Sequence, residues 1–261
     1  MARRSQCLSL LLILLPLGSA VAQVNYEIQV YGSETIPRGV TVFETHTNFT
    51  FQGTKQTVDG VLPTNHQLHE TIEITHGFND WFETGFYLFT SAQSTTGWQW
   101  VGSHIRPRVR APNNWHWPVG VSLSSEIGYQ RPSYSTDTWT WEIRPIIDKE
   151  LGRFYLAFNP SFGRSLHGPG VRGSFDFSPN FKLGYGLTKK VAAGFEYYGS
   201  LGPVTGFDRF HDQFQQFIPS LDIDFGPNWE FNFGVGVGVT RGTDHLLVKM
   251  IIGRRFGRKQ T

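Results

Sequence analysis

The strongest constraint on the fold is the strict alternation of apolar and polar residues from 68 to 89, which reads LHETIEITHGFNDWFETGFYLF. In its first half, Ile72 and Ile74 share one face while Glu73 lies on the other. Residues 77–81 (GFNDW) separate the two halves. A period of two around a short turn rich in Gly, Asn and Asp is typical of an antiparallel β-hairpin. The chain must therefore place an apolar face and a carboxylate-bearing face on opposite sides of one sheet.

The same alternation recurs along the chain and predicts twelve strands, an even number, with shorter connections after the even-numbered strands and usually longer ones after the odd-numbered strands. Strand 98–110 contains Pro107, and its alternation does not show which residues share a face. Beyond the two strands of 68–89, the predicted strands are 39–52, 98–110, 119–130, 138–148, 154–163, 175–185, 191–198, 217–225, 229–239 and 245–256.

The N-terminus predicts export. Arg3 and Arg4 precede an apolar run at 8–17, and Ala20-Val21-Ala22 follows as a cleavage site. We expect a signal peptide at 1–22, a periplasmic lead-in at 23–38, a barrel at 39–256 and a C-terminal tail at 257–261. Cleavage would remove Cys7, the single cysteine, so the mature chain could form no disulfide. It would carry 21 lysines and arginines against 21 aspartates and glutamates, which does not favour a nucleic-acid partner.

Composition separates a membrane barrel from a soluble sandwich or a lipocalin-like barrel. The chain is 15% aromatic with 29 glycines, yet only 39% hydrophobic, and the face opposite the apolar residues is polar in almost every strand. No apolar run after the signal is long enough for a membrane helix. Tryptophans gather near strand ends, as in interfacial girdles. We therefore predict an all-β fold, a closed antiparallel transmembrane β-barrel of about 12 strands with its apolar faces toward lipid.

Residues 76–85 (HGFNDWFETG) resemble a motif in a family of bacterial outer-membrane β-barrel transporters, some of which are named after the MetA pathway of phenol degradation. The resemblance would extend over about 39–256. It implies an outer-membrane location and passage of small molecules, and it carries no catalytic residues. Barrels of this kind usually end on an aromatic residue, whereas Phe256 is followed here by five more residues.

With the apolar faces toward lipid, the opposite faces line the lumen. If 53–65 is a simple hairpin connection, His46 would lie near Glu73 and Glu44 near Thr75. These acid-rich walls could form a cation-preferring constriction or a proton-sensitive group, or a neutralised network that fills a narrow barrel. The candidate lumen-lining residues are Glu44, His46, His69, Glu73, Glu83, Tyr87, Glu126, Glu142, Arg144, Asp176, Lys182, Glu196, Asp222, Asp224 and Glu230.

The sequence thus predicts a passive outer-membrane channel for small solutes, without catalytic residues, metal or cofactor. Its expected partners are outer-membrane lipid and lipopolysaccharide, the barrel assembly machinery and a small-molecule solute. One alternative is a lipid or lipopolysaccharide hydrolase, for which the candidates are Ser103 with His104, and His211 beside Asp208 and Asp212. Another is a structural barrel without transport.

Overall fold

The structure is a computed structural model, and it describes residues 26–257. The predicted signal peptide at 1–22 and most of the predicted C-terminal tail lie outside these residues. The strands are β1 (Thr41–Gln52), β2 (Gln67–Asn79), β3 (Phe82–Gln93), β4 (Gly97–Arg110), β5 (Gly120–Gln130), β6 (Trp139–Leu151), β7 (Phe154–Phe158), β8 (Ser161–His167), β9 (Asp176–Ser178), β10 (Asn180–Gly186), β11 (Val191–Ser200), β12 (Phe214–Ile223), β13 (Trp229–Gly238) and β14 (Leu246–Phe256). Two short 3-10 helices, Asn113–Trp115 and Pro169–Arg172, lie in connections.

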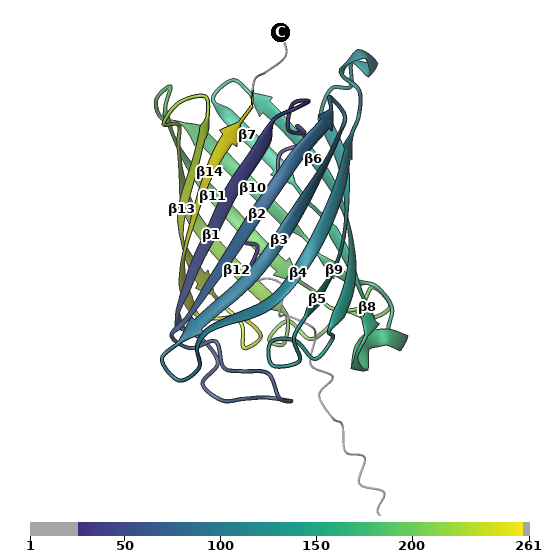
Figure 1. Ribbon diagram of the computed structural model, residues 1–261, viewed down its shortest axis with the longest axis vertical. Coiled ribbons are helices and arrows are strands. Elements are labelled where there is room, and N and C mark those ends of the chain that lie inside the picture. Colours follow the sequence, from purple (N-terminus) through teal and green to yellow (C-terminus); the bar gives the residue numbers. More distant parts are fainter. Residues whose placement is uncertain (1–25, 258–261) are drawn as a thin grey trace, which may run out of the picture.

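The strands of residues 26–257 form one closed antiparallel barrel with twelve strand positions around the ring (Figure 1). β7 and β8 together occupy one position and are separated at Pro160, and β9 and β10 together occupy another and are separated at Pro179. Proline has no backbone N–H to donate, which weakens the ladder at these two positions. Pro107, Pro145 and Pro219 nevertheless lie within the continuous strands β4, β6 and β12. β1 pairs with β14, and β5 pairs with β6, which completes the ring. The predicted fold class is confirmed.

The barrel wall has an apolar outer face and a polar inner face. In the hairpin of β2 and β3, Ile74 and Phe86 are 42% and 48% exposed, whereas Glu73 and Glu83 are at most 1% exposed. This distribution is the reverse of that in a soluble barrel, and the bilayer would cover the outer face. No helix among the described residues is long and apolar enough to cross a membrane.

The two ends of the barrel differ, and we call them the short-turn end and the long-loop end (Figure 1). The short-turn end carries the connections 80–81, 111–119, 152–153, 187–190 and 224–228. The long-loop end carries 53–66, 94–96, 131–138, 168–175, 201–213 and 239–245. The predicted alternation of shorter and longer connections holds for most of them, with 94–96 and 111–119 as the exceptions.

A β-bulge explains the irregular pattern of the predicted strand 98–110. Phe89 of β3 pairs with Gly102, but Thr90 pairs with Trp100, so Val101 has no partner in this ladder. An extra residue reverses which side chains face inward. Before it Trp100 points outward, and after it Arg106 and Arg108 point inward and are buried.

The segment of residues 26–38, which we call the inner segment, lies inside the barrel. Tyr26, Ile28, Val30 and Tyr31 are at most 7% exposed, although the segment belongs to no strand. A periplasmic lead-in was expected here, so the structure differs from that expectation. The physical reason is that the ring of twelve strands leaves a lumen too wide for its own side chains to fill, and the inner segment occupies that space.

Candidate functional site

The inner segment is tied to the barrel wall at the interruption between β7 and β8. The side-chain oxygen of Asn159 accepts a hydrogen bond from the Tyr31 backbone N–H at 2.6 Å, and its amide nitrogen donates to the Tyr31 carbonyl at 3.0 Å. Asn159 is 1% exposed. One side chain thus satisfies both backbone groups of a residue that has no strand partner.

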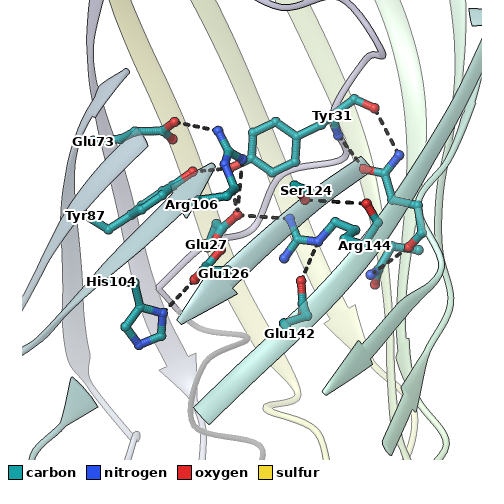
Figure 2. A network of polar contacts seen from close by, with 12 residues as sticks. Glu27, Tyr31, Glu73, Tyr87, His104, Arg106, Ser124, Glu126, Glu142 and Arg144 are labelled. Carbon is teal, nitrogen blue, oxygen red and sulfur yellow. Dashed lines mark hydrogen bonds and ion pairs between the residues drawn. The ribbon is translucent and has the colours of Figure 1, made fainter. Parts of the chain in front are cut away.

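Two arginines of the wall converge on Glu27 of the inner segment (Figure 2). Arg144 Nη1 of β6 lies 3.0 Å from Glu27 Oε1, and Arg106 Nη1 of β4 lies 3.8 Å from it. Each arginine also has a carboxylate on the wall. Arg144 Nε is 2.7 Å from Glu142, and Arg106 Nη2 is 2.9 Å from Glu73. The buried charges are therefore paired, as burial requires.

The Tyr31 ring completes this centre. Arg106 lies over the ring at 4.1 Å from its centroid, which is a cation–π contact. The Tyr31 hydroxyl donates to Glu27 at 2.7 Å and lies 3.2 Å from the Tyr87 hydroxyl of β3. The inner segment therefore presents one carboxylate and one aromatic ring to a cationic wall.

The two arginines control the charge of Glu27. Burial alone would raise the pKa of this carboxyl, but the Arg144 and Arg106 guanidinium groups outweigh burial and hold the pKa below its usual value. Glu27 is consequently ionised while the inner segment is docked.

Toward the short-turn end, Arg108 and Glu83 hold the inner segment by its backbone. Arg108 donates to the carbonyls of Gly32 at 3.0 Å and of Glu34 at 2.7 Å. The Glu83 carboxylate lies 2.7 Å from Arg108 Nε and accepts the Ile36 N–H at 2.5 Å. These contacts involve no segment side chain, so they fix the path of the segment.

A second charged group lies on the opposite wall. Lys249 of β14 donates to the Ile28 carbonyl at 2.9 Å and to Glu196 of β11 at 2.5 Å. Lys182 of β10 lies 3.4 Å from Glu196 and 2.7 Å from Asp222 of β12. Both sides of the lumen therefore bind the same stretch of inner segment.

Loops cover the lumen at the long-loop end. Tyr134 of the loop 131–138 is 6% exposed and packs in a cluster with Tyr26 and Phe89. Leu62 of the loop 53–66 packs against this cluster, and its N–H donates to the Ser133 carbonyl at 2.9 Å. The start of the described inner segment is therefore enclosed by two loops.

Two cavities lie at the short-turn end. One of about 420 Å³ is lined by Ser33, Gly120 and Asp148, among others, and another of about 840 Å³ is lined by Tyr155 and Lys182, among others. Both are open to solvent on one side. Both cavities lie beside the part of the lumen that the inner segment occupies, since Ser33 lines the first and Lys182 lines the second.

Most of the candidate lumen-lining residues face inward, and two groups of them meet in the networks described above. Residues on inner faces and buried are Glu44, His46, His69, Glu73, Glu83, Tyr87, Glu126, Arg144 and Glu196. Residues on inner faces and half-buried are Glu142, Lys182, Asp222 and Glu230.

Some candidates lie elsewhere or pair differently. Asp224 follows β12, is exposed, and accepts the Gly226 N–H at 2.7 Å in a turn, so it does not line the lumen. Asp176 lies near the long-loop end on the same inner face as Glu142, since both pair with Gly163, and it is half-buried. Glu230 pairs with Arg255 near the short-turn end.

The register between β1 and β2 also differs from the expected one. Glu44 pairs with Glu73 and not with Thr75, because the loop 53–66 is not a simple hairpin connection. His46 nevertheless lies near Glu73, at 3.3 Å.

Several site residues were absent from the candidates because the patterns that would reveal them are interrupted. Arg106 and Arg108 follow the bulge at Val101, which conceals their inward orientation. Glu27 and Tyr31 lie outside any strand, so period-two alternation does not apply to them.

The geometry separates the proposed hydrolase residues. His104 points inward and pairs with Glu126 at 2.6 Å, whereas the neighbouring Ser103 points outward, where Trp100 Nε1 lies 3.4 Å from its hydroxyl. Their side chains lie on opposite faces of β4, so they do not form a catalytic pair. His211 lies 3.1 Å from Asp212, and both are about half exposed in the loop 201–213.

Comparison with known proteins identifies the fold. No protein family matches the sequence, and no curated protein matches it. Among solved structures, an outer membrane channel from Pseudomonas putida F1 has a TM-score of 0.55 at 10% identity, covering 88% of this chain and 100% of that one. The NanC porin has a TM-score of 0.52 at 7% identity, covering 83% of this chain and 99% of that one. The KdgM porin in complex with oligogalacturonate has a TM-score of 0.50 at 11% identity, covering 83% of this chain and 99% of that one. The chain therefore shares the barrel fold of these proteins.

Proposed function

We propose that this protein is an outer-membrane channel for small polar solutes, and that the inner segment closes it. The observation that carries the proposal is the nature of the lumen filling. The wall carries many polar and ionisable side chains, and its centre is occupied by a separate stretch of chain that hydrogen bonds, ion pairs and two apolar clusters hold in place.

A filling of this kind is removable in principle. The wall residues that bind the inner segment keep partners on the wall itself, as Arg106 does with Glu73 and Lys249 does with Glu196. Release of the segment would thus leave Arg106, Arg144 and Lys249 paired, and it would open a path through twelve strands. Lumens of this width lie between those filled by side chains and those of large porins.

The similar structures support this proposal. They include two porins and an outer membrane channel, one of them in complex with oligogalacturonate. For this chain we infer a location in the bacterial outer membrane, with the short-turn end in the periplasm and the long-loop end outside. Lipid, lipopolysaccharide and the assembly machinery would then be its partners, and the predicted signal peptide would direct its export.

A second candidate is a structural barrel that never conducts. The observation in its favour is that the inner segment and two loops together enclose the centre of the lumen. The two candidates predict different conductance for a barrel from which the inner segment has been removed.

Planar bilayer recording separates them. The mature protein is compared with a variant lacking residues 26–36, which retains Gly39 and its bond to the Gly77 carbonyl. A heat-modifiable shift on a gel shows that each barrel has folded. We expect rare conductance steps from the mature protein and frequent, larger steps from the deletion variant. A folded deletion variant without conductance would favour the structural barrel, and release of fatty acid from lipid or lipopolysaccharide by the mature protein would favour a hydrolase.

A further inference from the structure

We propose that Glu44, His46 and Glu73 form a binding site for a divalent transition-metal ion on the inner wall of the barrel. The proposal does not depend on channel activity, because it rests on the wall residues of β1 and β2 alone. No spacing motif in the sequence points to this site, since its ligands come from two strands.

The two strands bring the three side chains to one place. Glu44 and Glu73 are direct partners across the ladder between β1 and β2, and His46 is the next inward residue on β1. One ligand atom from each residue lies within 4.8 Å of the others. All three side chains are buried, with at most 6% exposed.

Two buried atoms of these residues, Glu44 Oε1 and His46 Nδ1, have no hydrogen-bond partner. His46 Nε2 and Glu73 Oε2 lie 3.3 Å apart, which is ion-pair distance. Buried polar groups without partners cost free energy, and a bound cation would satisfy all three residues at once.

Neighbouring residues orient the ligands. Glu73 uses its other oxygen, Oε1, to bind Arg106 at 2.9 Å and Thr75 at 2.6 Å, which leaves Oε2 directed at His46. Such outer contacts fix ligand orientation in metal sites. Gly253 makes room on the other side, because a Cβ there would lie 2.9 Å from Glu44 Cγ.

The donor set selects the class of ion. One imidazole and two carboxylates suit Zn²⁺ and related ions, whereas Mg²⁺ and Ca²⁺ prefer oxygen ligands alone. In a tetrahedral Zn²⁺ site with bonds of about 2.1 Å, ligand atoms lie about 3.4 Å apart. The 3.3 Å between His46 and Glu73 already matches this spacing, and rotation of the Glu44 side chain would bring its oxygen into range. Three protein ligands leave a fourth position for water.

His69 provides a matched control on the same wall. It is 1% exposed, like His46, but its ring packs edge-on against Tyr26 at 4.8 Å between centroids, and no carboxylate lies within ion-pair distance of it among residues 26–257. Substitution of either His46 or His69 removes a buried histidine from the lumen, but only substitution of His46 removes a proposed metal ligand.

Equilibrium dialysis of the untagged mature protein against Zn²⁺, followed by metal quantification, tests the proposal. We expect one Zn²⁺ per chain in the wild type and in His69→Gln, and affinity reduced at least about ten-fold in His46→Gln and in Glu44→Gln. Excess Mg²⁺ should not displace the Zn²⁺. The heat-modifiable gel shift shows which variants fold. If His46→Gln does not fold, Glu44→Gln alone tests the site. No Zn²⁺ in the wild type, or Zn²⁺ bound with wild-type affinity by both ligand variants, would overturn the site.

Discussion

Replacement of Glu27 by Gln should weaken docking of the inner segment by about 2 kcal/mol. The carboxylate makes one charge-assisted hydrogen bond to the wall, with Arg144 at 3.0 Å, and a longer contact with Arg106 at 3.8 Å. A hydrogen bond to a charged group contributes about 1.5–3 kcal/mol. The bond from the Tyr31 hydroxyl lies within the segment and does not count toward docking.

The loss should stay below the 3–5 kcal/mol that is typical when one partner of a buried ion pair is removed. Arg144 retains Glu142 at 2.7 Å, and Arg106 retains Glu73 at 2.9 Å, so neither guanidinium is left unpaired. A change of about 2 kcal/mol corresponds to an undocked population increased about 30-fold.

Cysteine labelling measures this population. The single cysteine, Cys7, lies in the predicted signal peptide, so a cysteine introduced at Ser124 would be the sole thiol of the mature chain. Ser124 is 1% exposed on the inner wall beside Arg144, and a polar thiol reagent should reach it when the segment is undocked. We expect its labelling rate to rise about 30-fold in Glu27→Gln. Cysteine at Ser94, in the exposed connection 94–96, is the control and should label at the same rate in both backgrounds.

An unchanged rate at position 124 would refute the reasoning, because it would mean that Glu27 does not hold the segment. An equal rise at positions 94 and 124 would point to general loosening of the barrel.

Three further predictions concern the same segment. The pKa of docked Glu27 is lowered, so its contribution to docking is complete above the usual value of about 4.5 and is lost as the pH falls through the lowered value. Channel opening in bilayers should therefore increase in acid for the wild type. A similar increase in Glu27→Gln would show that protonation of Glu27 is not the cause. Gly77→Ala should displace the segment where it leaves the barrel, since a Cβ would lie 2.1 Å from the Ile36 carbonyl oxygen. Labelling at position 124 should therefore rise. An unchanged labelling rate would show that the segment passes Gly77 at a greater distance. Asn159→Ala should cost about 1–3 kcal/mol of docking, because it removes both side-chain bonds to Tyr31. Asn180→Ala removes only side-chain bonds to the carbonyls of Asn159 and Ser178 and none to the inner segment, so it should not raise labelling; equal effects would contradict a specific role for Asn159.

The sequence was sufficient to predict the barrel because the wall obeys one rule. Period-two alternation identified the strands, and their observed ends differ from the predicted ones by a few residues in most cases. The outward orientation of Ile74 and Phe86 follows from the polar residues opposite them. The interruptions at Pro160 and Pro179 each divide one predicted strand into two shorter strands. The order around the ring is unchanged, so the barrel still has twelve strand positions.

The centre of the site was not predictable in the same way. The bulge at Val101 reverses the pattern, and only the pairing of β3 with β4 shows that Arg106 faces inward. The inner segment obeys no strand periodicity, since its backbone bonds go to side chains such as Asn159 and Arg108. The register of Glu44 with Glu73 depends on the conformation of the loop 53–66, which alternation does not specify.

The central claim, that the inner segment closes the channel, is tested most directly by locking it in place. The Ser33 Cβ lies 3.2 Å from the position of a Cβ at Gly120, slightly less than the usual separation of about 3.5–4.5 Å in disulfides. A Ser33→Cys and Gly120→Cys double variant would therefore link the segment to β5. The single variants are controls, because each introduces a new side chain but neither can form the link. The account predicts that conductance steps are absent when the double variant is oxidised and return on reduction in the same bilayer, while the single variants do not respond. Conductance that is the same in the oxidised and reduced double variant would contradict it.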